Sequence, residues 1–124
     1  GLASALGAIA ATRPETAEDA YRFGELVGVS YQIADDLVDY LSYVNGIKKK
    51  LDPAERSFEA WAKTTLSPNN GEFTNKVLSY LREKVAEASA EASRLFSEGP
   101  LKDVMPELPR FFVNSMLLQM KLSI

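Results

Sequence analysis

The chain has 124 residues, of which 46% are hydrophobic and 25% are charged, and its formal net charge is −3. This length corresponds to one small domain, and because no basic face dominates the sequence, the composition argues against nucleic-acid binding. The absence of cysteine and histidine excludes a disulfide framework, a thiolate or imidazole metal site and a Ser-His-Asp triad.

Residues 2–11 are rich in alanine and glycine and predict a first helix. Small side chains permit a neighbouring helix to approach closely, so we expect this segment to pack tightly. A break follows at Pro14, and Thr16 with Asp19 three residues later resembles a capping box in which Asp replaces the usual Glu or Gln. This pattern predicts the start of a second, longer helix.

The long helix is predicted to run from about Ala17 to Tyr43. Apolar and small residues recur along one side of it with the helical period. They are Phe23, Leu26, Val27, Ser30, Ala34, Leu37 and Leu41. The pair Asn45-Gly46 suits the end of the helix, because glycine readily adopts the left-handed conformation of many helix C-termini.

An acidic cluster lies inside this helix, at Asp35, Asp36 and Asp39. At about 100° per residue, these three residues and Gln32 fall within an arc of about 100°, opposite the apolar stripe. Like charges at i and i+4 destabilise a helix, and the C-terminal half of a helix disfavours negative charge. A positive group should therefore compensate, either a hard divalent cation with its preference for oxygen ligands or the basic run Lys48-Lys49-Lys50.

Two glycines lie on or beside the acidic side of this helix, at Gly24 and Gly28. A residue without a side chain leaves the helix surface narrow at that point. We therefore expect this side to admit a ligand or another backbone closely.

Three further helices are predicted after the basic run. Asp52-Pro53 marks the start of a short helix, in which we expect Trp61 to lie in the core or an interface. Residues 73–97 predict a second long helix, whose charged side chains, Glu91 among them, should face solvent. A last helix begins at Pro109 and is apolar around much of its circumference, so it should be buried against this chain or another. With no secretory signal and no apolar span of about 18 residues, we expect no transmembrane segment and a cytoplasmic protein.

A bare Asp-Asp-x-x-Asp pattern is commonly no more than solvated surface. Here the flanks are more specific, because Gly28-Val29-Ser30-Tyr31-Gln32 precedes the aspartates. The pattern Gly-x-x-aromatic-Gln-x-x-Asp-Asp-x-x-Asp resembles the second aspartate-rich motif of the trans-prenyl diphosphate synthases, the polyprenyl synthetase family. Residues 6–11 and 21–24 are also similar to the sequence that precedes this motif in the family. The resemblance is good at the N-terminal end of the chain and loose beyond the long helix.

The resemblance implies an all-α fold, an antiparallel helical bundle that forms half of an isoprenoid-synthase-type fold. The family's catalytic bundle is considerably longer than this chain and carries two aspartate clusters that face each other across a cavity. We therefore expect residues 1–124 to be a single helical domain, the C-terminal part of a larger one. A missing N-terminal half or a partner chain would supply the first cluster. The chain alone would then be inactive, and we expect it to form a homo- or hetero-oligomer.

The resemblance also implies the activity of a Mg²⁺-dependent prenyltransferase. In the family reaction an allylic diphosphate loses its pyrophosphate, isopentenyl diphosphate attacks the carbocation-like fragment, and a proton is lost. Asp35 would be the leading metal ligand, and Asp36 and Asp39 would bind the metal directly or through water. The diphosphate would be bound by Gln32 and by a lysine of the basic run, since a lysine is a suitable point charge for a phosphate group. These lysines are Lys48, Lys49 and Lys50.

Two alternatives stay open beside this interpretation. Some relatives of these synthases are noncatalytic partner or regulatory subunits, but a purely structural subunit has no need for three unneutralised carboxylates. A half of a head-to-head synthase or of a terpene cyclase is the other alternative, and the Tyr31-Gln32 flank disfavours it.

Overall fold

The computed structural model describes residues 7, 11, 13–47, 52–65 and 73–124. Within these residues the chain contains α-helices and short 3-10 turns, and no strand occurs among them. The α-helices are α2 (Ala17–Val44), α3 (Pro53–Thr65), α4 (Phe73–Leu95) and α5 (Leu108–Leu117). The 3-10 turns are η1 (Pro14–Thr16), η3 (Met105–Glu107) and η4 (Leu118–Met120). The all-α prediction is confirmed, whereas the expected first helix and the basic run fall mostly or wholly outside the described residues.

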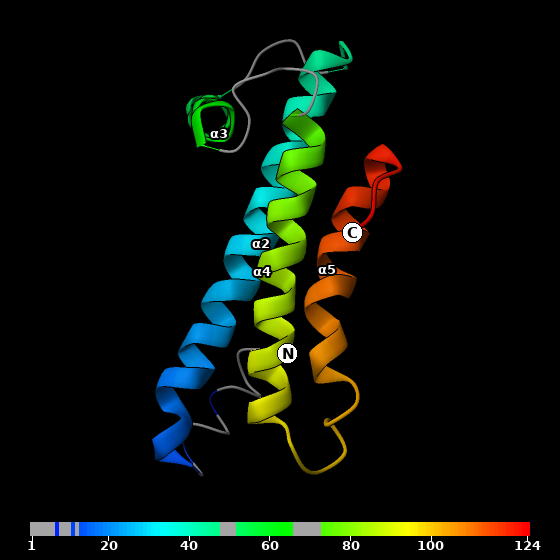
Figure 1. Ribbon diagram of the computed structural model, residues 1–124. Coiled ribbons are helices and arrows are strands. Elements are labelled where there is room, and N and C mark those ends of the chain that lie inside the picture. The colour runs from blue at the N-terminus through cyan, green and yellow to red at the C-terminus, as the bar shows by residue number, and fades with distance from the viewer. Residues whose placement is uncertain (1–6, 8–10, 12, 48–51, 66–72) are drawn as a thin grey trace.

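The three helices α2, α4 and α5 lie side by side, and α4 runs antiparallel to both α2 and α5 (Figure 1). The chain runs along α2, returns along α4 and reverses again into α5, as short connections between successive helices favour. The remaining helix, α3, lies across the end of the bundle at which α2 ends and α4 begins. Within the described part of the chain, every helix is too short or too polar to cross a lipid bilayer.

The long helix α2 buries a single stripe of side chains. These are Ala20, Phe23, Val27, Ser30, Ile33, Ala34, Leu37 and Val38. The hydroxyl of Ser30 donates to the Leu26 carbonyl over 2.7 Å, so this buried polar group is satisfied within the helix. The predicted bounds of the helix are confirmed to within one residue. One side of α2 therefore packs in the core, and its opposite side does not.

Two hydrophobic clusters form the core. The first lies toward α3 and includes Leu37, Phe58 and Leu81. The second lies at the other end of the bundle, where Phe23 of α2 meets Phe96 after α4 edge to face, with ring centroids 6.5 Å apart. Because α2 contributes to both clusters, its orientation is fixed along most of its length.

The C-terminal end of α2 forms as the Asn45-Gly46 pair predicts. Gly46 has a φ of 80°, and its N–H donates to the Tyr43 carbonyl over 3.1 Å. The N–H of Ile47 donates to the Ser42 carbonyl over 2.9 Å. These two bonds are those of the Schellman motif, which satisfies carbonyls left unpaired at the end of a helix.

The expected capping box at the start of α2 is wrong. Thr16 makes no side-chain cap, and its hydroxyl instead donates to the Arg13 carbonyl over 2.7 Å. The reason is that the 3-10 turn Pro14–Thr16 leads directly into α2, which keeps Thr16 out of the extended conformation that an N-cap residue normally adopts.

The expectation that Glu91 faces solvent is also wrong. Its side chain is only 7% exposed, and its Oε1 lies 3.1 Å from the Arg22 Nε of α2 and also pairs with Arg94 one turn along α4. The packing of α4 against α2 covers this position, and the two guanidinium groups offset the cost of burying the carboxylate. Among the described residues, Oε2 of Glu91 has no hydrogen-bond partner.

Candidate functional site

The acidic residues of α2 lie on the side of the helix that faces away from its buried stripe. We call Gln32, Asp35, Asp36 and Asp39 the acidic face. The three aspartates are half-buried, whereas Gln32 is exposed. The structure thus brings these four predicted residues together on one helix surface, as their spacing predicts.

Within the acidic face, Gln32 and Asp36 are joined by a hydrogen bond. The Gln32 amide Nε2 donates to Asp36 Oδ1 over 3.1 Å, one helical turn further along α2. A bond of this kind reduces the rotational freedom of the carboxylate and directs one of its oxygens. Gln32 is therefore in a position to orient Asp36.

Asp36 also borders an apolar hollow of about 370 Å³ between α2, α3 and α4. The other residues that line it are Val29, Ile33, Ser57, Phe58, Trp61 and Tyr80. The Trp61 and Tyr80 rings meet edge to face with centroids 5.3 Å apart. Trp61 is half-buried and packs against the first core cluster, in agreement with its predicted place in the core or an interface. The sequence did not indicate the hollow, because it forms only when three separate helices meet.

The surface around the acidic face is open at Gly28. A Cβ added to Gly28 meets no atom within 4 Å, and the residue is exposed. Nothing in the described part of the chain therefore requires a glycine at this point of α2.

The donor set of the acidic face suits a hard divalent cation. Carboxylate and amide oxygens are the ligands that Mg²⁺ takes in proteins. Among the described residues, no group of three or more acidic, histidine or cysteine side chains is placed to hold a metal ion by itself. Carboxylates along one helix do not surround a point, but Mg²⁺ usually takes only one or two protein carboxylates and completes its shell with phosphate oxygens and water. The acidic face therefore fits Mg²⁺ that is bound together with a phosphate-bearing ligand.

The lysines expected to bind the diphosphate fall outside the described residues. Lys48, Lys49 and Lys50 follow the end of α2, and their place relative to the acidic face stays a prediction. A role for the three aspartates and Gln32 in binding a metal or a diphosphate likewise stays a prediction.

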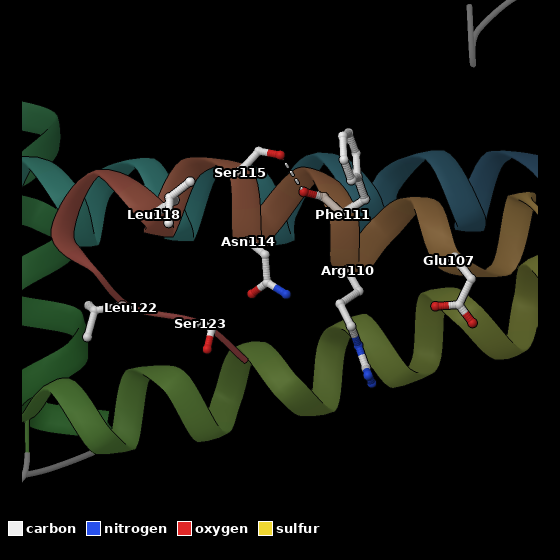
Figure 2. A pocket seen from close by; sticks show the side chains of 8 residues that line it. All are labelled: Glu107, Arg110, Phe111, Asn114, Ser115, Leu118, Leu122 and Ser123. Carbon is white, nitrogen blue, oxygen red and sulfur yellow. Dashed lines mark hydrogen bonds between the residues drawn. The ribbon is translucent and has the colours of Figure 1, made fainter.

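A second hollow, of about 500 Å³, lies along α5 (Figure 2). It is lined by Glu107, Arg110, Phe111, Asn114, Ser115, Leu118, Leu122 and Ser123. No aspartate of the acidic face borders it. The sequence analysis noted that the last helix is apolar around much of its circumference, but it did not predict this hollow or the exposure of Phe111 and Leu118.

Residues 1–98 match the family model described as polyprenyl synthetase. The matched segment contains α2, α3, α4 and the whole acidic face, and it ends before α5. No curated protein and no solved structure shows a significant match to the chain.

Proposed function

The chain belongs to the polyprenyl synthetase family, and we propose that its acidic face binds the diphosphate of an allylic substrate through Mg²⁺. This function is of the prenyltransferase type. The reaction would join the allylic diphosphate to isopentenyl diphosphate. The observation that carries the proposal is the arrangement of three half-buried aspartates on the side of α2 that faces away from the core.

The electrostatic repulsion among these aspartates supports the proposal. Negative charges one turn apart repel each other, and the C-terminal half of a helix offers them no compensation from its dipole. A face of this kind gains stability when a cation binds to it. All three aspartates lie within the segment that matches the family model.

Each residue of the acidic face takes a distinct role in this proposal. Asp35 is the leading metal ligand, and Asp39, one turn along the helix, reaches toward the same region. Asp36 binds directly or through water, and its hydrogen bond from Gln32 keeps one of its oxygens directed. When bound, Mg²⁺ supplies Lewis-acid neutralisation of the charge that develops on the departing pyrophosphate. A lysine among Lys48, Lys49 and Lys50 would add a further positive charge at the diphosphate.

We propose that the remaining ligands come from outside residues 1–124. One cluster of aspartates on one helix supplies only part of a Mg²⁺-diphosphate site, and the family pattern includes an opposing cluster. A missing N-terminal half or a partner chain would contribute it. On this basis, the chain is part of a larger catalytic unit and is inactive alone.

A condensation assay tests the proposed function. Labelled isopentenyl diphosphate and an allylic diphosphate are supplied with Mg²⁺ or with EDTA to the chain alone and to the chain assembled with its natural upstream or partner segment. We expect product only from the assembly, and only with Mg²⁺. Product from the chain alone would contradict the need for a second cluster. An inactive but correctly assembled complex would contradict the prenyltransferase assignment and favour a noncatalytic subunit.

A further inference from the structure

The helices α2 and α4 contribute buried residues to the core with the same repeat. We call the buried residues Ala20, Phe23, Val27, Ser30, Ala34 and Leu37 the α2 seam, and the buried residues Leu78, Leu81, Val85, Ala88, Ala92 and Leu95 the α4 seam. Within each seam the members are separated alternately by three and four residues, which is the seven-residue repeat of paired helices. Both seams contribute to the same two core clusters. A slide of one helix along the other by seven residues therefore brings apolar or small side chains opposite each other again.

The seams themselves contain no polar contact that selects one register. Ser30 is their one polar member, and its hydroxyl donates to the Leu26 carbonyl of its own helix over 2.7 Å. In paired helices a polar group that bonds across the seam is a common determinant of register. Because Ser30 is satisfied within α2, it behaves as a small side chain and favours no particular position of α4.

A charged contact beside the seams does distinguish the registers. Glu91 precedes Ala92 of the α4 seam, its side chain is 7% exposed, and its Oε1 accepts from the Arg22 Nε of α2 over 3.1 Å. Arg94 also pairs with Glu91, but it belongs to α4 and would move with it. Arg22 is the only basic residue in the sequence of α2. Only the observed register therefore gives the buried carboxylate a cation from the neighbouring helix.

A slide of seven residues in either direction removes this contact. One slide brings Val29 to the place of Arg22, so that the buried carboxylate faces an apolar side chain. The opposite slide brings Arg22 toward Lys84. It also brings Glu15 toward Glu91, so like charges meet at both points. Since Oε2 of Glu91 has no hydrogen-bond partner in the described part of the chain, a register that also removes Arg22 from Oε1 is strongly disfavoured.

We infer that Arg22 and Glu91 are a positioning pair, which sets the register of α2 on α4 and thereby places the acidic face. Arg22 and Asp36 belong to one continuous helix and lie about 21 Å apart along its axis at 1.5 Å per residue. Asp36 and Tyr80 of α4 line the same hollow. A slide by one repeat would move Asp36 about 10 Å along α4 and away from Tyr80. The placement of the acidic face rests on the proposed function, whereas the setting of the register does not.

A pair that sets the register and a pair that only stabilises predict different outcomes when both charges are removed. Replacing a buried ion pair by apolar side chains is often neutral or stabilising. Arg22→Met/Glu91→Met should therefore keep its helix content by circular dichroism and melt no lower than the wild type. Its α2 and α4 helices should nevertheless populate more than one register. A pair that only stabilises would leave a single register in this variant.

Electron paramagnetic resonance distances between two spin labels measure the register directly, since the chain has no cysteine of its own. Glu18→Cys on α2 and Ser79→Cys on α4 place the labels at exposed positions. A slide by one repeat changes their offset along the helices by about 10 Å. We expect one narrow distance in the otherwise unchanged chain and a second, shifted population in Arg22→Met/Glu91→Met. A single unchanged distance in that variant would overturn the inference.

Two further pairs of substitutions separate the register from other effects of removing charge. Lys84→Met/Glu87→Met is the matched control, because this ion pair lies within α4, and it should keep the single distance. Arg22→Glu opposes two carboxylates and should shift the distance, and the exchange Arg22→Glu/Glu91→Arg should restore it. The exchange decides the question even if the methionine variant does not fold. An exchange variant that resembles Arg22→Glu alone would overturn the inference.

Paramagnetic broadening links the register to the acidic face in the labelled 124-residue chain. Mn²⁺ with pyrophosphate should broaden the amide signals of residues 32–39 and of Tyr80 across the hollow. In Arg22→Met/Glu91→Met, residues 32–39 should stay broadened while the Tyr80 signal recovers in part. A wild type with one spin-label distance but no selective broadening would contradict the proposed function and would leave the register supported. Equal broadening of Tyr80 in the wild type and in this variant would overturn the placement of the acidic face by the Arg22–Glu91 pair.

Discussion

The side-chain amide of Gln32 donates a hydrogen bond to Asp36 Oδ1 over 3.1 Å, one turn along α2. This bond links the only amide of the acidic face to its middle aspartate. Groups that orient a metal-binding carboxylate influence metal binding without touching the metal. The relationship therefore makes Gln32 a positioning residue in the proposed site.

Replacement of Gln32 by alanine tests this positioning role. Gln32→Ala should change the free energy of unfolding by only about 0.2–0.5 kcal/mol, because the residue is exposed and its contact is a single i,i+4 pair. The affinity for Mg²⁺-pyrophosphate should fall by about 10-fold or more if Asp36 loses its orientation. Isothermal titration calorimetry measures this affinity in the assembled enzyme. Asn75→Ala, at an exposed amide on α4, is the control and should bind normally, whereas equal binding by both variants would count against the role.

Neutralising Asp35 should separate catalysis from stability. Asp35→Asn keeps the size of the side chain and relieves repulsion within the acidic face, so the melting temperature should stay the same or rise slightly. Turnover of the assembled enzyme should fall by about 10²- to 10³-fold, the scale for the loss of one preorganised stabiliser of developing charge. Asp103→Asn, in the exposed segment before η3, is the matched control. If both variants retain normal turnover, the three aspartates are solvated surface residues with no role in catalysis.

The contact between Arg22 and Glu91 predicts an asymmetric effect on stability. Glu91 is buried and accepts from two guanidinium groups, whereas the Arg22 side chain is 60% exposed. Glu91→Gln should lower the free energy of unfolding by about 1.5–3 kcal/mol, because it weakens hydrogen bonds that involve a buried charge. Arg22→Ala should cost less than Glu91→Gln, because the buried carboxylate keeps its pair with Arg94. Urea denaturation of the two variants measures both losses, and a larger loss for Arg22→Ala would show that Arg94 alone does not compensate the buried carboxylate.

Gly28 predicts that stability and assembly change in opposite directions. The residue is exposed in the middle of α2 and an added Cβ meets nothing within 4 Å, so Gly28→Ala should stabilise the chain by about 0.5–1 kcal/mol through its helix propensity. If the missing half or a substrate approaches closely at this point, the same methyl group should impair assembly or turnover. Thermal unfolding of the chain and turnover of the complex measure the two effects. A variant that improves both would show that the acidic face is not a close-contact surface.

For the part of the chain that the structure describes, the sequence was sufficient to predict the helices and the acidic face. The 3.6-residue period defines α2, and Gly46 marks its end because the left-handed conformation there favours glycine. The positions of Gln32, Asp35, Asp36 and Asp39 on one side follow from helical geometry alone. These features depend on local spacing, which a single sequence contains in full.

Features that depend on contacts between distant helices could not be predicted in this way. The helical period of α4 predicts Glu91 to be a surface residue. Its burial depends on contact with α2, where Arg22, 69 positions earlier in the chain, pairs with it. The hollow beside Asp36 requires side chains from three helices. The sequence showed that the last helix is apolar around much of its circumference, but it did not show that Val113 and Leu117 would face the core and leave Phe111 exposed.

The central claim is that the acidic face binds a divalent cation together with a diphosphate. Nuclear magnetic resonance of the isotopically labelled chain tests it directly, with Mn²⁺ in place of Mg²⁺ as a paramagnetic probe and pyrophosphate as the anion. We predict that Mn²⁺ with pyrophosphate broadens the amide signals of residues 32–39 selectively, and that Asp35→Asn reduces this broadening strongly. Broadening spread evenly over the acidic surface of the chain, or an Asp35→Asn spectrum that responds like the wild type, would contradict the claim.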